Sequence, residues 1–112
     1  MRENLTIITR IKKTIEYLDN IIENYPKSEI VLRNELKSNC FKLLENSYYA
    51  KYSRDKETFQ MGMIVNINLI DYYLKRSMEK EIISYKKYLK IGRHLTEITK
   101  MTFGWINYEK SK

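Results

Sequence analysis

Between residues 84 and 107, apolar residues recur at steps of three and four. Because an α-helix turns once every 3.6 residues, this spacing places them in one stripe along a helix. The stripe consists of Tyr88, Ile91, Leu95, Ile98, Thr102 (through its methyl group) and Trp105. We therefore expect a long amphipathic helix that needs a packing partner. It is expected to end near Gly104, because glycine readily adopts the left-handed conformation that closes many helices, and Trp105 is expected to fill a pocket.

A second row on the same segment is mostly cationic and lies on the side away from the apolar stripe. It comprises Lys86, Lys90, Arg93, Glu97 and Lys100. Residues 75–112 hold ten basic and four acidic side chains, so this part contributes +6 of the net charge of +7. A patch of one sign attracts polyanions, and nucleic acid is the usual one; a merely solvated lysine-rich face is the alternative. The candidate nucleic-acid-binding residues are Lys75, Arg76, Lys86, Lys87, Lys90, Arg93 and Lys100.

A first helix is predicted for residues 5–24, where the apolar spacing defines a seam typical of helical bundles. The seam is formed by Ile8, Ile11, Ile15, Leu18, Ile22 and Tyr25. Pro26 ends this helix, because the residue before a proline is disfavoured in the helical conformation. Ser28 is the expected N-cap of a second helix, with Glu29 in its first turn.

The second helix is expected to reach about residue 51 and to contact two neighbours, because its apolar positions cover more than one face. They are Leu32, Leu36, Leu43 and Ala50, widened by Phe41, Leu44 and Tyr48. After a polar link in which Asp55 can act as a cap, a third helix is predicted over residues 57–76. Its apolar side carries Phe59, Met63, Ile67, Ile70 and Leu74, with Ile64, Tyr72 and Tyr73 beside them. Asn66 and Asn68 interrupt this side and are expected to face solvent or another subunit.

Four helical segments joined by short links specify the fold class. Three glycines and one proline are too few for the many tight turns of a sandwich or barrel. A chain of 112 residues, 43% of them hydrophobic, suffices for one core. Residues 77–83 are expected to form the last link, with Ser84 as the cap of the fourth helix. We predict an all-α protein with a single domain over residues 1–112, folded as an antiparallel up-down-up-down four-helix bundle.

The chemistry-bearing side chains do not assemble into a recognisable catalytic pattern. Cys40, the only cysteine, is spaced as a small core residue, and His94, the only histidine, is the sole imidazole that could activate it. One cysteine and one histidine cannot supply the ligands of an ordinary zinc site. No carboxylate pair or phosphate-binding glycine loop is present either. We therefore expect no enzymatic activity, no metal and no cofactor.

The apolar segments also bear on location. The longest uninterrupted ones, such as residues 61–65, are far shorter than the roughly 20 residues that span a bilayer. Residues 1–10 lack an apolar run of signal-peptide length. We expect no membrane partner and a cytoplasmic location, which the single cysteine fits.

Several of these stretches resemble one family along nearly the whole chain. They are the turn Tyr-Pro-Lys-Ser-Glu at residues 25–29, the helix end Tyr-Tyr-Ala at 48–50, and the segment Glu-Ile-Thr-Lys-Met-Thr-Phe-Gly-Trp-Ile at 97–106. Their order resembles the Avd-like proteins, the accessory variability determinants of diversity-generating retroelements. Members of that family typically end the last helix with Glu-Ile-Gly-Arg-Met-Leu-Gly-Gly-Trp. Lys100 stands at the arginine position and Gly104 and Trp105 match, whereas Thr99, Thr102 and Phe103 depart from the pattern.

The resemblance implies a basic four-helix bundle that assembles into a homopentameric ring. It also implies binding to a partner reverse transcriptase and to template RNA or its cDNA during mutagenic copying, with Gly104 and Trp105 in structural or oligomer contacts. Ten tyrosines and five methionines suit such an assembly, because amphipathic aromatic side chains are common where subunits meet. Two alternatives remain: a bundle of the kind encoded within ribosomal RNA intervening sequences, and a helical protein-interaction module that binds no nucleic acid.

Overall fold

The computed structural model describes the backbone of residues 2–112 and the side chains of residues 6–112. Four helices account for most of this part: α1 (Arg2–Ile22), α2 (Ile30–Tyr52), α3 (Lys56–Glu79) and α4 (Tyr85–Lys110). A short 3-10 turn, η1 (Lys27–Glu29), precedes α2. Residues 2–112 contain no β-strand. The predicted all-α class and its four helices are therefore confirmed.

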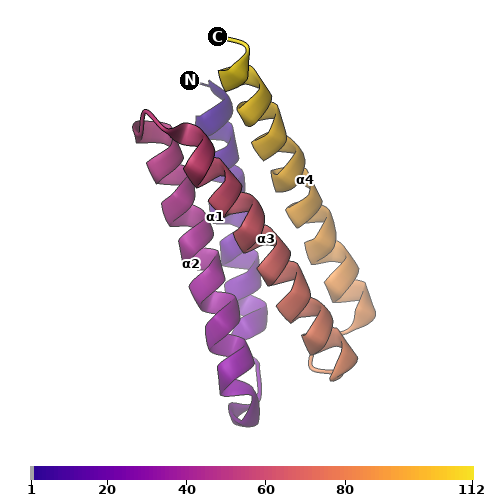
Figure 1. The fold of residues 1–112 in the computed structure, drawn as a ribbon. Coiled ribbons are helices and arrows are strands. Elements are labelled where there is room, and N and C mark those ends of the chain that lie inside the picture. Colours follow the sequence, from indigo (N-terminus) through magenta and orange to yellow (C-terminus); the bar gives the residue numbers. More distant parts are fainter. Residues whose placement is uncertain (1) are drawn as a thin grey trace.

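The helices run alternately up and down, so that both chain ends lie beside the link between α2 and α3 (Figure 1). α1 packs against α2 and α4, and α3 packs against the same two helices. The diagonal pairs, α1 with α3 and α2 with α4, lie farther apart, with no Cα atoms within 8 Å of each other in the described part. This is the neighbour pattern of an antiparallel four-helix bundle. The α2–α3 pair is packed most extensively.

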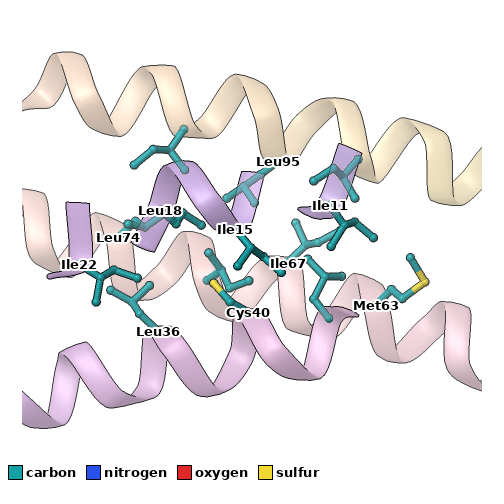
Figure 2. Close-up of a cluster of buried hydrophobic side chains, with 14 of the residues drawn as sticks. Ile11, Ile15, Leu18, Ile22, Leu36, Cys40, Met63, Ile67, Leu74 and Leu95 are labelled. Carbon is teal, nitrogen blue, oxygen red and sulfur yellow. The ribbon is translucent and has the colours of Figure 1, made fainter. Parts of the chain in front are cut away.

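Isoleucine and leucine from all four helices converge on one core (Figure 2). The predicted seam of α1 is buried throughout, and Ile7 and Ile21 join it from the flanking positions. Ile91, Leu95 and Ile98 bring the predicted stripe of α4 into the same core. Burying one such side chain stabilises the fold by about 1.5–3 kcal/mol relative to leaving it in water. The core residues labelled in Figure 2 are Ile11, Ile15, Leu18, Ile22, Leu36, Cys40, Met63, Ile67, Leu74 and Leu95.

Two of the predicted caps are confirmed. The Asp55 carboxylate accepts hydrogen bonds from the Thr58 backbone N–H (3.3 Å) and hydroxyl (2.6 Å) at the start of α3. These bonds hold the pKa of Asp55 below its usual value. The Ser84 hydroxyl oxygen accepts from the Lys87 N–H (3.1 Å) at the start of α4. Both side chains satisfy a backbone donor that the first helical turn leaves free.

Three predicted helix ends are wrong. Ser28 caps nothing, because the 3-10 turn delays the start of α2 until Ile30. α3 continues past residue 76 to Glu79, with Ser77 buried inside it. α4 passes straight through Gly104 to Lys110, and none of the described glycines has a positive φ. Gly104 is thus an exposed residue within the helix, and the chain keeps the helical conformation for six more residues, to Lys110.

Asn66 is buried between α2 and α3, contrary to the prediction that it faces solvent or another subunit, whereas Asn68 is exposed. Its side-chain oxygen accepts a hydrogen bond from Asn46 Nδ2 (2.8 Å), and its own Nδ2 donates to Asn39 Oδ1 (3.5 Å). Gly62 lies at the same seam, where an added Cβ would be 2.9 Å from Asn46 Nδ2. At this close approach Gly62 lies against the Asn46 side chain, and three amides pair across the contact.

Two aromatic side chains that were predicted to widen the core are instead exposed. Phe41 on α2 is 56% exposed and Tyr72 on α3 is 55% exposed. No helix within the described residues is long and apolar enough to cross a membrane.

Candidate nucleic-acid interface

The cationic row of α4 lies on the outside of the bundle. Lys86, Lys90, Arg93 and Lys100 are all exposed, on the opposite side of the helix from the buried residues Ile91, Leu95 and Ile98. Because Ser84 fixes the start of α4, the row begins in the first helical turn, and Lys87 is exposed beside it. None of these cations has a carboxylate at ion-pair distance among residues 6–112. Their charge is therefore available to an anionic ligand.

A groove between α1 and α4 extends this surface. A cleft of about 350 Å³ is lined by Arg10, Lys90, Arg93, His94 and Glu97. A second cleft, of about 590 Å³, is lined by Thr6, Thr9, Arg10, Lys13, Glu97 and Met101. Since Arg10 and Glu97 line both clefts, the two are parts of one groove, which we call the basic groove. Four cations and a single carboxylate line it in total, so its potential is positive.

Arg10 and Lys13 were missed as candidate residues. They belong to residues 1–25, where four basic and four acidic side chains cancel, so net charge along the chain gave no sign of them. Their position next to the buried seam of α1 was visible in the spacing, but only the structure shows that this edge faces α4.

Tyr17 connects the two sides of the basic groove. The Lys90 Nζ lies 4.9 Å from the centre of the Tyr17 ring, and the His94 ring lies 5.7 Å from it. A cation over an aromatic face is worth about 0.5–1 kcal/mol at an exposed site. This contact holds the Lys90 ammonium over α1, which narrows the range of positions in which it can meet a phosphate.

Lys75 and Arg76 do not line the basic groove, although both are exposed. Arg76 lines a different cleft, between α2 and α3, and forms an ion pair with Glu79 (3.5 Å). The structure therefore separates Arg76 from the cationic row of α4.

Gly104 and Trp105 also differ from each other in placement. Trp105 is 1% exposed and belongs to the core, as the prediction of a filled pocket requires. Gly104 is exposed, and an added Cβ would meet nothing within 4 Å. Trp105 thus belongs to the interior of the bundle, whereas Gly104 lies on its surface.

Cys40 is buried, as predicted for a small core residue. Burial raises the pKa of its thiol to about 12. The thiol therefore stays protonated at neutral pH, and a nucleophilic role needs the thiolate. Residues 6–112 contain no group of three or more His, Cys, Asp and Glu side chains that could hold a metal ion.

The model of the family described as bAvd-like matches residues 5–109. No curated protein and no solved structure shows a match to the chain. The family match covers the four helices almost completely, and it agrees with the turn and helix-end motifs noted in the sequence. The four-helix architecture, the basic surface and this match lead to one identification: the chain belongs to the bAvd-like family, whose members are non-catalytic accessory proteins of diversity-generating retroelements.

Proposed function

We propose that this protein binds template RNA, or the cDNA copied from it, through the basic groove and the cationic row of α4. In this role it serves a partner reverse transcriptase in the cytoplasm as a homo-oligomer, which the family resemblance implies to be a pentamer. The observation that supports the proposal best is the meeting of cations from the first and last helices in one groove.

The groove suits a phosphate backbone rather than a particular base. Arg93 and Arg10 offer planar guanidinium groups that can each hold a phosphate with two hydrogen bonds, and Lys90 adds a point charge. Contacts of this kind position a nucleic acid without reading its sequence. Glu97 at the centre of the groove repels phosphate locally, so we expect the strand to run along the rim and to contact the cations on either side of it.

Charge reversal in the row tests the proposal. We expect the triple substitution Lys86→Glu, Lys90→Glu and Arg93→Glu to abolish RNA binding in fluorescence anisotropy at low salt, with helicity unchanged because all three side chains are exposed. For the native protein, log Kd should rise with log salt by roughly 0.7–0.9 for each phosphate contact.

A matched control separates the groove from overall charge. Lys27→Glu, Lys42→Glu and Arg54→Glu change three exposed cations outside the groove and lower the net charge by the same amount. This variant should bind RNA within a few-fold of the native protein. Equal losses in both variants would mean that only net charge matters, and no RNA affinity in the native protein would leave the protein-interaction alternative as the better one.

The reverse transcriptase partnership needs its own experiment. We expect a reverse transcriptase encoded beside this chain to co-purify with it after co-expression and nuclease treatment. A genomic neighbourhood without a reverse transcriptase and its template and variable repeats would contradict this part of the proposal.

A further inference from the structure

The outward side of α3 carries an apolar stripe that the fold of a single chain leaves uncovered. Met61, Val65, Leu69 and Tyr72 follow one another at steps of four, four and three, so they lie on one side of the helix. They are 45%, 55%, 37% and 55% exposed. We call these four residues the α3 stripe. Single exposed apolar side chains are common on protein surfaces, but a continuous stripe usually marks a contact.

The α3 stripe lies in a stretch without charge. Residues 58–70 include no ionisable side chain. A helix on the surface of a bundle ordinarily places charged residues on its outward side, as α1 does with Lys12, Lys13 and Glu16. α3 therefore has the composition of a helix that is covered on both sides.

α2 adds exposed apolar side chains at both ends of the α3 stripe. Tyr49, which is 56% exposed, stacks on Phe59 of α3 with ring centres 5.1 Å apart. Val31, which is 73% exposed, lies with Tyr72 in a cleft of about 360 Å³ between the two helices. The charged residues that line this cleft balance one another: they are Glu29, Glu35, Arg76 and Lys80.

We infer that the α3 stripe and its α2 flank form the surface on which a second copy of this chain packs. The inference rests on the oligomeric part of the proposed function and locates the contact. Two identical chains each bring a net charge of +7, so they can approach closely only where the surface is uncharged or locally neutral. The α2–α3 side meets this condition, whereas the basic groove does not.

An unrelated partner would be under a different constraint. A protein that binds a chain of net charge +7 gains from opposite charge, and it would be drawn to the cations of α4 rather than to a surface with no charge to recognise. A second copy also leaves the basic groove open, because the groove lies between α1 and α4, on the other side of the bundle from the α2–α3 contact.

The test compares two double variants by multi-angle light scattering and native mass spectrometry at micromolar concentration. We expect the native protein to have a mass that is a multiple of 13.6 kDa and Val65→Glu with Leu69→Glu to have the mass of one chain. The control, Asn20→Glu with Asn107→Glu, adds two negative charges at exposed positions of α1 and α4, away from the α3 stripe and its α2 flank, and should keep the native mass. A milder pair, Val65→Ser with Leu69→Ser, should weaken assembly without introducing charge, and circular dichroism should show unchanged helicity in all variants.

Each outcome separates the inference from the proposed function. An assembled native protein whose mass is unaffected by Val65→Glu with Leu69→Glu overturns the location and leaves the oligomer intact. A native protein that is a single chain at all concentrations overturns both. A variant that has the mass of one chain and still binds RNA in a salt-dependent way supports the inference. It also shows that the basic groove binds RNA without assembly of the chains.

Discussion

The two seams that lie on opposite sides of the bundle are built in different ways. Between α2 and α3, Gly62 lets the helices approach until Asn46 and Asn66 hydrogen-bond across the contact. Between α1 and α4, long cationic side chains line a groove, and Tyr17 with Lys90 makes the connection. The α2–α3 seam is thus closely packed at Gly62, and the charges of the cleft at its other end balance one another. The α1–α4 seam is instead lined mostly by cations, which can meet an anionic ligand.

Trp105 is the largest fully buried side chain among residues 6–112, and its loss should be the most costly change. Its indole N–H has no hydrogen-bond partner among residues 6–112, so its contribution is packing. We expect Trp105→Ala to lower the free energy of unfolding by about 3–5 kcal/mol in urea denaturation. Gly104→Ala, at the adjacent exposed position, should be neutral or stabilise by up to about 1 kcal/mol. A destabilised Gly104→Ala variant would restore the interpretation of this glycine as a helix end.

Substitution of Asn66 tests the hydrogen bonds that join α2 and α3. Removing its amide takes away the acceptor of Asn46 Nδ2 and the donor to Asn39 Oδ1, although Asn39 Nδ2 keeps its bond to the Glu35 carbonyl. Asn66→Ala should therefore cost about 1–3 kcal/mol in free energy of unfolding. Asn68→Ala, two residues away but exposed, should change stability by no more than about 0.5 kcal/mol. If Asn66→Ala and Asn68→Ala lowered the melting temperature equally, the hydrogen bonds of Asn66 to Asn46 and Asn39 would not stabilise the α2–α3 seam.

One glycine substitution in the α2–α3 seam and one at an open position of α4 give the sharpest contrast. Gly62→Ala places a Cβ 2.9 Å from Asn46 Nδ2, which breaks the pairing with Asn66 or separates the helices. After a gain in helix propensity of about 1 kcal/mol, we expect a net loss of about 1 kcal/mol. Gly92→Ala on α4 meets nothing within 4 Å and should stabilise by about 1 kcal/mol. If chemical denaturation showed that both substitutions change the free energy of unfolding in the same direction, the close packing at Gly62 would be contradicted.

The caps of α3 and α4 should show the smallest effects and a difference in pH dependence. Hydrogen bonds from Thr58 lower the pKa of the Asp55 carboxyl in the folded protein. The ionised carboxylate therefore stabilises the fold at pH values above the pKa of an unfolded aspartate, about 3.9, and this stabilisation is lost as the pH falls through the pKa of the folded state. Asp55→Ala should therefore lower the melting temperature at pH 7 and have little effect at pH 2. Ser84→Ala should lower it equally at both pH values, because a hydroxyl does not titrate in this range. If Asp55→Ala lowered the melting temperature by the same amount at pH 7 and pH 2, the capping role of the Asp55 carboxylate would be contradicted.

Spacing of apolar residues was sufficient to predict the bundle, because burial follows helical periodicity directly. It also predicted which side of α4 carries the cations. What it could not show is which helices become neighbours, so the α1 cations of the basic groove were missed. Nor could it distinguish Asn66 from Asn68, since both interrupt an apolar side and only the approach of α2 at Gly62 decides which is buried. The end of α4 was misplaced for a related reason: glycine permits a left-handed turn but does not require one.

The basic groove joins the first helix to the last, so ligand binding there is linked to folding of the whole chain. Its cations come together only when α1 and α4 are both in place, and an unfolded chain offers no such cluster. A polyanion that binds the folded form alone stabilises it by about 2.7 kcal/mol at a hundredfold excess over Kd. Like charges lie close together in the free groove, and a bound polyanion would reduce their mutual repulsion. The proposed binding of nucleic acid in this groove would therefore stabilise the contact between the first and the last helix.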